Sequence, residues 1–529
     1  MAPRAHKLES LKKKNDNLPE RKSQWSRDKL LLQIFALVSF VKVLLVPTYH
    51  STDFEVHRNW LAITHSLPIN QWYTNSKSEW TLDYPPLFAW FEWLLSQFGK
   101  LVDPEMLKVD NLNYASRGTI LFQRATVMFS DLALVYGVRE VGKVYSTSFN
   151  NFAVFSFLTL CNIGLLMVDH IHFQYNGFLL GILLIAIAEV SKPDQRNIII
   201  GAGAFAVLLN LKHLYLYVAP AFIVWLLKWY CLRSGNFFLR LIHLGGIVFV
   251  VLAVSFGPFV TQFPQVLARL FPFKRGLTHA YWAPNAWALY IGGDKVLSAL
   301  WKRLGWLSMT KTATMTGGLV QEDKLSVLPT PTPLVTFIAT VLAILPALIS
   351  LFRKKQYSLK PSDFLSCLVL CGLGSFIFGW HVHEKAILTA IIPLCALATA
   401  DILNARVFMI LSATGHTSIL PLLFPQNLTI LKITMLLTYT AASCVCLPKL
   451  HKHSLLQLHE WLYIAALPLV TLYETLIHKM VFGEGLPFLP LAMTSIYCGI
   501  GVMYSWLLYY HNYLSDQIKE TTTMAKKKR

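Results

Sequence analysis

Charged side chains are scarce in this chain of 529 residues, because Asp, Glu, Lys and Arg together make up only 14% of it, against roughly 25% in soluble domains. Apolar residues make up 54%, and the mean hydropathy is +0.48. This balance excludes a disordered chain and an ordinary soluble enzyme, and it predicts a polytopic membrane protein. The net charge of +19 does not indicate nucleic-acid binding, because the basic residues lie in tails and short connections between apolar runs.

Cysteine patterns of the disulfide or zinc type are also lacking. Seven of the eight cysteines lie within apolar runs, and Cys231 lies at the edge of one. Cys367 and Cys371 are one helical turn apart, and no pair has the spacing of a zinc ribbon. These cysteines are interpreted as small buried hydrophobic residues, which excludes a disulfide-stapled secreted scaffold. The sequence also lacks a soluble domain, a low-complexity stretch and a repeat of fixed period.

Fourteen apolar segments are candidates for membrane-spanning helices, each of which needs about 20 residues. The chain is therefore predicted to be an all-α membrane protein with about 14 transmembrane helices. The predicted spans lie near 30–47, 119–138, 151–168, 177–190, 197–211, 214–230, 241–260, 333–352, 363–380, 386–400, 405–424, 428–447, 455–478 and 488–510.

The two ends of the chain predict its orientation. Residues 1–29 carry nine Lys or Arg against four acidic residues, which is typical of a cytosolic tail before a signal-anchor. Fourteen spans, within 30–510, then return residues 511–529 to the cytosol, and cytosolic connections carry cations such as Arg139 and Lys192. Lys526 and Lys527 resemble a dilysine signal for the endoplasmic reticulum, with a basic tail held at anionic lipid as the alternative.

Polar clusters gather on the opposite, lumenal side, where ionisable groups beside a bilayer are functional candidates. The first cluster begins at Asp53, shortly after the first span. Residues 54–66 predict an amphipathic helix with Phe54, His57 and Trp60 at helical spacing, so Asp53, like Thr52, is also a candidate helix cap. Arg58 in this segment is either a functional cation or a contact to lipid headgroups.

The second cluster contains Asp83 and Tyr84, which stand directly before Pro85 and Pro86. Two prolines end regular structure and fix a turn. Asp83 is therefore either a turn carboxylate or a functional one. An amphipathic pattern resumes over residues 87–100, and the tryptophans around it are typical of a membrane-interface belt.

Two further clusters each contain a His-x-His pair between predicted spans. They contribute His170, His172, Gln174 and Asn176 from one connection, and His381, His383, Glu384 and Lys385 from the other. Such pairs raise a zinc site as one interpretation, but zinc needs three or four well-placed ligands. The competing interpretation is that these groups bind phosphate and sugar hydroxyls. Glu384 is expected to have a structural role by pairing with a lumenal cation.

The fifth cluster lies in residues 261–332, which are predicted to form a lumenal loop without strong secondary structure, and loops of this length are usually functional or disordered. It holds Arg275 among aromatic residues, in a composition typical of carbohydrate contacts or of a belt that rests on lipid. Lys212 and His213 add cationic groups at the same membrane face.

These groups match the chemical demands of transfer from a lipid-linked phosphosugar. The phosphate is already a good leaving group, so the acceptor hydroxyl needs a carboxylate base and the departing phosphate needs cations. No step requires a metal or a cofactor, and we predict neither. From the residues alone, a lipid or solute transporter with charges lining its path remains an alternative.

The clusters, in this order and spacing, resemble the dolichyl-phosphate-glucose-dependent α-1,3-glucosyltransferases of N-glycan assembly from about residue 45 to the last spans. That family has a branch for the first glucose and a branch for the second. The stretches His57-Arg58-Asn59-Trp60 and His279-Ala280-Tyr281-Trp282 resemble the second-glucose branch, because the first-glucose branch has Gln-Arg-His-Trp at the former and lacks the latter. The first-glucose activity stays open as an alternative.

The resemblance implies a GT-C fold, in the membrane of the endoplasmic reticulum with the active site facing the lumen. It implies dolichyl phosphate glucose as donor and Glc1Man9GlcNAc2-pyrophosphoryl-dolichol as acceptor, with inversion of the anomeric centre. The base in such enzymes is an aspartate soon after the first span, which maps onto Asp53, with Asp83 as runner-up. An aspartate with an ordinary pKa is ionised near neutral pH and suffices.

The remaining candidates are assigned to substrate binding. His381, His383 and Lys385 are expected to flank the donor phosphate, and Asp83 and Tyr84 to contact substrate. Hydroxyl groups of the sugars are expected to meet His170, His172, Gln174 and Asn176. Further positive charge for phosphate groups is expected from Arg58, Lys212, His213 and Arg275.

Overall fold

The computed structural model describes residues 18–233, 235–271, 276–278, 282–306, 325–423 and 425–527, with side chains described between residues 24 and 515. The regular secondary structure of this described part is helical, apart from one isolated bridge between Thr278 and Val382. The helices are α2 Leu18–Leu45, α3 Thr52–Ser66, α4 Pro86–Val102, α5 Arg117–Ser130, α6 Leu132–Tyr145, α7 Phe149–Leu160, α8 Ile163–Met167, α9 Asn176–Ser191, α10 Gln195–Leu211, α11 Ala219–Leu226, α12 Phe237–Phe256, α13 Phe263–Leu270, α14 Ala286–Arg303, α15 Pro333–Arg353, α16 Pro361–Phe378, α17 Leu388–Ala400, α18 Ile402–Ile419, α19 Thr429–His451, α20 Leu458–Leu472, α21 His478–Phe482 and α22 Leu489–Lys527.

Short 3-10 or π-helical segments interrupt or connect these helices. They are η1 Ile69–Gln71, η2 Pro104–Leu107, η3 Val168–Phe173, η4 His213–Tyr217, η5 Leu227–Cys231, η6 Gly257–Gln262, η7 Gln356–Ser358, η8 Glu384–Ile387, η9 Leu420–Leu422, η10 Gln426–Leu428 and η11 Tyr473–Ile477. Two of them, η3 and η8, lie in the predicted His-x-His clusters. Polar side chains in these two connections therefore stand on a short π-helical segment and a short 3-10 segment.

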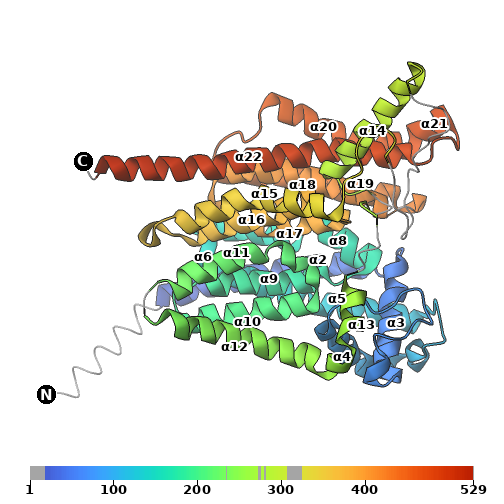
Figure 1. The fold of residues 1–529 in the computed structure, drawn as a ribbon, viewed down its shortest axis with the longest axis horizontal. Coiled ribbons are helices and arrows are strands. Elements are labelled where there is room, and N and C mark those ends of the chain that lie inside the picture. Colours follow the sequence, from blue (N-terminus) through green and yellow to red (C-terminus); the bar gives the residue numbers. More distant parts are fainter. Residues whose placement is uncertain are drawn as a thin grey trace.

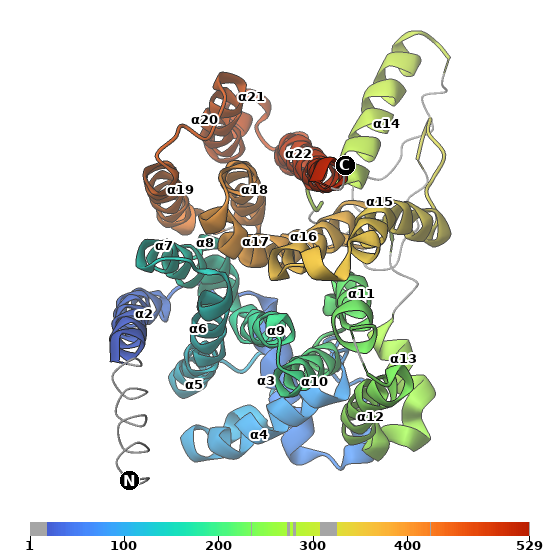
Figure 2. The ribbon, with the colours of Figure 1, turned by 90° about the vertical axis from the view of Figure 1, so that its left-hand side faces the viewer.

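Most of the long helices lie side by side with their axes along the longest dimension of the molecule (Figure 1). Viewed along these axes, α17 lies between α18 and the group formed by α6 and α9 (Figure 2). Every residue of α17 from Leu388 to Thr399 is buried, so this helix forms the centre of the bundle. Helices α3, α4 and α13 gather at one end of it (Figure 1).

Seven helical stretches are long and apolar enough to cross a membrane, and three shorter apolar ones join them in the described residues. The seven are Phe149–Phe173, Phe237–Leu270, Pro333–Arg353, Pro361–Phe378, Gln426–His451, Leu458–Phe482 and Leu489–Ser515, and the three are Asn176–Ser191, Gln195–Leu211 and Ala219–Cys231. They confirm an all-helical, polytopic membrane protein. The other predicted spans, near 30–47, 119–138, 386–400 and 405–424, are not among them.

Two predictions, one about a span and one about a connection, need correction. The predicted span near 119–138 is divided into α5 and α6, since Asp131 ends one helix and begins the next. The connection 261–332, expected to lack strong secondary structure, contains α13 and the 18-residue helix α14. The amphipathic helices predicted at 54–66 and 87–100 are confirmed as α3 and α4.

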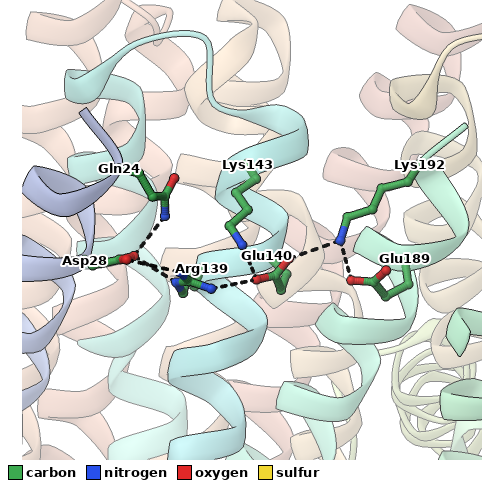
Figure 3. A network of polar contacts seen from close by, with 7 residues as sticks. All are labelled: Gln24, Asp28, Arg139, Glu140, Lys143, Glu189 and Lys192. Carbon is green, nitrogen blue, oxygen red and sulfur yellow. Dashed lines mark hydrogen bonds and ion pairs between the residues drawn. The ribbon is translucent and has the colours of Figure 1, made fainter. Parts of the chain in front are cut away.

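A polar network ties α2, α6 and α9 together (Figure 3). It lies near the C-terminal ends of α6 and α9, away from the end of α2 that leads to Asp53. Arg139 pairs with Asp28 at 2.9 Å and with Glu140 at 3.1 Å. Glu140 also accepts from Lys143 and from Lys192, at 2.5 and 3.1 Å. The cations predicted to share one side of the membrane thus meet at one end of the bundle, where carboxylates compensate them.

Candidate active site

Asp53 stands in the first turn of α3, and a neighbouring serine frees its side chain from capping that helix. Ser51 Oγ accepts from the Asp53 backbone N–H at 3.1 Å and donates to the His172 carbonyl at 2.6 Å. The extended backbone of Ser51 places its hydroxyl over the helix end. The prediction that Thr52 or Asp53 caps the helix was therefore wrong.

Three donors converge on one oxygen of the Asp53 carboxylate. Lys385 Nζ lies 3.1 Å from Oδ2, and His172 Nε2 lies 3.2 Å from it. The amide nitrogen of Gln174 donates to the same oxygen. No donor from the described residues reaches Oδ1, and the side chain keeps 24% exposure. One oxygen is thus held by the protein while the other is left accessible.

The electrostatic surroundings keep Asp53 ionised. Burial on its own would raise the pKa of this carboxyl, but the charge of Lys385 and the hydrogen bond from His172 outweigh it and hold the pKa well below its usual range. The charge of His57, one turn along α3, acts in the same direction. The group is therefore a carboxylate at neutral pH.

Lys212, at the end of α10, places a second cation near Asp53. Its Nζ donates to Asn176 Oδ1 at 3.3 Å and lies 5.0 Å from the centre of the Tyr84 ring. Burial and the charge of Lys385 lower the pKa of Lys212 to about 8, while nearby carboxylates including Asp83 act against this. The second sequence cluster therefore reaches the site through Tyr84 by contact and through Asp83 by charge.

Glu384 lies beside Lys385 without the cation expected for it. It is buried, and neither carboxylate oxygen has a hydrogen-bond partner among the described residues. Burial raises its pKa to about 7, although the charge of Lys385 acts against this shift. The expected ion pair is absent from this part of the chain, because the Lys385 ammonium pairs with Asp53 instead.

The paired histidines do not turn toward a common point. His170 Nε2 lies 2.9 Å from Asp131 Oδ2, an oxygen that also binds Lys42 Nζ at 2.7 Å, whereas His172 turns to Asp53. The rings of His381 and His383 are 5.9 Å apart. Over the residues that the structure describes, no three or more His, Cys, Asp or Glu side chains gather as a group that could hold a metal.

Four segments from distant parts of the sequence therefore form one polar site, with a carboxylate, two lysines, an imidazole and two amides. A comparison with protein families matches residues 38–509 to the ALG6, ALG8 glycosyltransferase family. The chain belongs to this glycosyltransferase family.

Individual relatives of this glycosyltransferase are similar over nearly their whole length. The chain is 50% identical over 504 residues to the dolichyl pyrophosphate Glc1Man9GlcNAc2 alpha-1,3-glucosyltransferase of Bos taurus, covering 90% of this chain and 94% of the relative. It is 50% identical over 510 residues to the protein of that name in Mus musculus, covering 92% and 96%. A relative in Drosophila melanogaster, named as probable, is 49% identical over 497 residues, covering 91% and 94%.

Several predicted site residues of the glycosyltransferase lie away from Asp53. Arg58 is fully buried, binds both oxygens of Glu55 at 2.7 Å and donates to the carbonyls of Met106 and Lys108. It joins α3 to η2. His170 faces Asp131, and the His213 ring lies 5.3 Å from that of Phe271. Arg275 lies outside the described residues.

The fifth sequence cluster, in the connection 261–332, nevertheless contacts the cluster that contains His381 and Lys385. His381 Nδ1 contacts the Gly276 carbonyl at 2.8 Å, and the His381 backbone N–H donates to Leu277 at 2.9 Å. His381 has φ of +51°, in the left-handed region that is uncommon for residues other than glycine. The connection after α13 thus fixes the backbone that leads to Lys385.

Two contacts that support this candidate site were not predicted from the sequence. Arg124 on α5 donates through Nη2 to the carbonyls of Tyr49 and Ile171, both at 2.9 Å. His57 Nδ1 lies 2.6 Å from Glu92 Oε1, and both side chains are buried. The position of His57, four residues after Asp53, was a usable signal, but nothing in the sequence pairs it with Glu92 on α4.

Proposed function

We propose that the protein is an inverting hexosyltransferase that moves glucose from dolichyl phosphate glucose to Glc1Man9GlcNAc2-pyrophosphoryl-dolichol. The product is Glc2Man9GlcNAc2-pyrophosphoryl-dolichol, extended in α-1,3 linkage for protein N-glycosylation. The names of the relatives support the acceptor and the linkage. The motif forms at His57–Trp60 and at Trp282 favour the second glucose over the first.

The observation that carries the mechanism is the unequal treatment of the two Asp53 oxygens. With Oδ2 held by three donors, Oδ1 is the atom available to accept the proton of an acceptor hydroxyl. The hydroxyl oxygen attacks the anomeric carbon, the bond from that carbon to the phosphate oxygen breaks, and dolichyl phosphate leaves with the electron pair. A base that acts in this way contributes about 10²–10⁴-fold to the rate.

The cations of the site suit the departing phosphate. In this proposal Lys385 both holds Asp53 ionised and, with Lys212, His381 and His383, faces the phosphate. His172, Gln174 and Asn176 orient sugar hydroxyls, and Asp83 and Tyr84 contact substrate. Dolichol-linked lipids and the membrane are the partners, and the mechanism uses no metal or cofactor.

The proposal extends to architecture and place. The helices belong to a GT-C fold of about 14 spans within residues 30–510, between cytosolic tails at 1–29 and 511–529. The end of the bundle that holds Asp53 faces the lumen of the endoplasmic reticulum. The concentration of Arg139, Lys143 and Lys192 at the other end supports this orientation (Figure 3).

The test is a glucosyl-transfer assay on purified protein with dolichyl phosphate glucose. Acceptors bear no glucose or one glucose, and wild type, Asp53→Asn and Asp83→Asn are compared with and without chelator. We expect transfer only to the monoglucosylated acceptor, lost in Asp53→Asn and unaffected by chelator. Transfer to the unglucosylated acceptor assigns the first-glucose reaction. If glucosyl transfer is lost in Asp83→Asn but not in Asp53→Asn, Asp83 is the base. Movement of the donor across the membrane without bond formation identifies a transporter.

A further inference from the structure

Asp169 is a buried carboxylate that the proposed mechanism does not use. It is 1% exposed and lies in η3, directly before the connection to α9. Its two oxygens accept the backbone N–H groups of Asn176 and Gly177, at 3.1 and 2.6 Å. These bonds alone describe a cap on α9, but a third bond leads from Asp169 toward Asp53.

This third bond begins a chain of oriented amides. Asn176 Nδ2 donates to Asp169 Oδ1 at 2.9 Å and to Gln174 Oε1 at 2.8 Å. The amide nitrogen of Gln174 then donates to Asp53 Oδ2. Asp169 and Asp53 thus lie at the two ends of a continuous series of hydrogen bonds.

The polarity of the chain follows from its charged ends. A carboxylate accepts hydrogen bonds and an ammonium donates them, whereas an amide has one end of each kind. Asp169 therefore draws the nitrogen of Asn176, while Lys212 Nζ, 3.3 Å away, draws its oxygen. With Asn176 in this orientation, the oxygen of Gln174 faces Asn176 and its nitrogen faces Asp53. Reversing either amide would place an oxygen against a carboxylate.

The backbone around the chain is built to keep these groups close. A Cβ atom on Gly177 would lie 2.2 Å from Asp131 Oδ1 and 3.3 Å from Asp169 Oδ2, so only glycine admits both carboxylates here. Phe173, between the two residues that reach Asp53, has φ of +91°. Such a conformation is rare for residues other than glycine and persists where surrounding contacts impose it.

We infer that Asp169 is a positioning residue, which acts through Asn176 to fix the Gln174 amide with its nitrogen on Asp53. The inference rests on the proposed function, since it matters for catalysis only if Asp53 is the base. It predicts that Asp169 influences the chemical step more than donor binding. A carboxylate that merely caps α9 would not depend on Gln174 for its effect.

The experiment is a double-mutant cycle in the full-length protein with the isosteric variant Asp169→Asn and with Gln174→Ala. Each single variant is expected to lower kcat about tenfold, and Asp169→Asn is expected to keep the donor KM within about twofold of wild type. The double variant is also expected to lose about tenfold rather than a hundredfold, because both changes remove the same contact. Losses that multiply would overturn the inference.

A matched control comes from the same membrane segment. Asn162 is buried, caps α8 through the Leu165 N–H and lies outside the chain of amides. Asn162→Ala combined with Gln174→Ala is expected to give losses that multiply. If this pair is as non-additive as the first, the coupling is general to the fold and the inference fails.

Two further measurements keep the outcome decisive. If Asp169→Asn does not fold, Asn176→Ala with Gln174→Ala tests the middle of the chain by the same criterion. The cycle is also followed by thermal unfolding in detergent. If the losses of thermal stability are coupled but the wild-type protein transfers no glucose, the proposed function is wrong and the chain of amides is retained. If the wild-type protein is active, the losses of stability add and the losses of kcat multiply, then the inference about the chain of amides is wrong and the proposed function is retained.

Discussion

Lys385 Nζ lies 3.1 Å from Oδ2 of Asp53, across 332 positions of sequence. The pair joins the first turn of α3 to the short segment before α17. The bundle brings these two ends together, so the ammonium and the carboxylate compensate each other at one end of the helices. The charge state of Asp53 therefore depends on a residue from the distant part of the chain.

Replacing Lys385 by methionine is predicted to move the acid limb of kcat/KM to higher pH. Burial raises the pKa of Asp53 and Lys385 lowers it, so without the ammonium the pKa rises. Only the ionised form is active. As the pH falls, the variant is therefore expected to lose activity at a pH about 1 to 3 units higher than wild type does. Lys385→Arg keeps the charge and serves as the control. An acid limb that stays in place in Lys385→Met would contradict the electrostatic role of Lys385.

Lys212 is predicted to set the basic limb of the same profile. Its pKa is lowered to about 8, so a cation that meets phosphate is lost as the pH rises through that value. In Lys212→Arg the charge persists, because arginine stays protonated, and the limb near pH 8 is expected to disappear or move upward. Lys108→Arg, with 61% exposure of the lysine, is the control. A limb unchanged in Lys212→Arg would show that another group titrates.

Ser51 is predicted to stabilise α3 while Thr52 is not. Ser51→Ala removes the cap and the bond to the His172 carbonyl, and it is expected to lower the free energy of unfolding by about 1 kcal/mol. Thr52 is exposed, so Thr52→Ala is expected to change the free energy of unfolding by less than about 0.5 kcal/mol. Thermal unfolding in detergent compares the two. Equal effects would argue against the cap assigned to Ser51.

Arg58 is predicted to matter for stability more than for substrate. Arg58→Ala leaves Glu55 buried without its partner, which is expected to cost about 3–5 kcal/mol of unfolding free energy. The exposed pair of Lys77 and Asp110 supplies the control, because Lys77→Ala is expected to cost less than about 1 kcal/mol. A folded Arg58→Ala protein with weakened donor binding and normal stability would instead place Arg58 in the substrate site.

Much of the local structure was predictable from sequence because it depends on neighbouring residues. The spacing of Phe54, His57 and Trp60 predicted α3, and the two prolines after Tyr84 predicted where α4 begins. The candidate caps Thr52 and Asp53 were wrong, because Ser51, directly before them, accepts the hydrogen bond from the Asp53 backbone N–H. The ion pair predicted for Glu384 does not form with Lys385, because the Lys385 ammonium pairs with Asp53, from a helix more than 300 positions earlier.

The side-chain directions within the His170–Asn176 segment were not predictable in this way. His170 and His172 are equivalent in sequence, yet one faces Asp131 and the other Asp53. Side chains two positions apart in the π-helical turn of η3 point in different directions, and the partner that each one meets depends on the elements that carry Asp131 and Asp53. Arg124 contributes to this through its bond to the Ile171 carbonyl.

The sequence by itself determined that the chain is a helical membrane protein, which polar clusters it carries and which family it resembles. These properties follow from composition, periodicity and local motifs, which involve residues close along the chain. The tertiary structure decided which charged groups meet: Asp53 with Lys385 and His172, His170 with Asp131, and Arg58 with Glu55. The physical reason is that buried charges require partners, and only the packing of distant helices brings those partners within hydrogen-bonding distance.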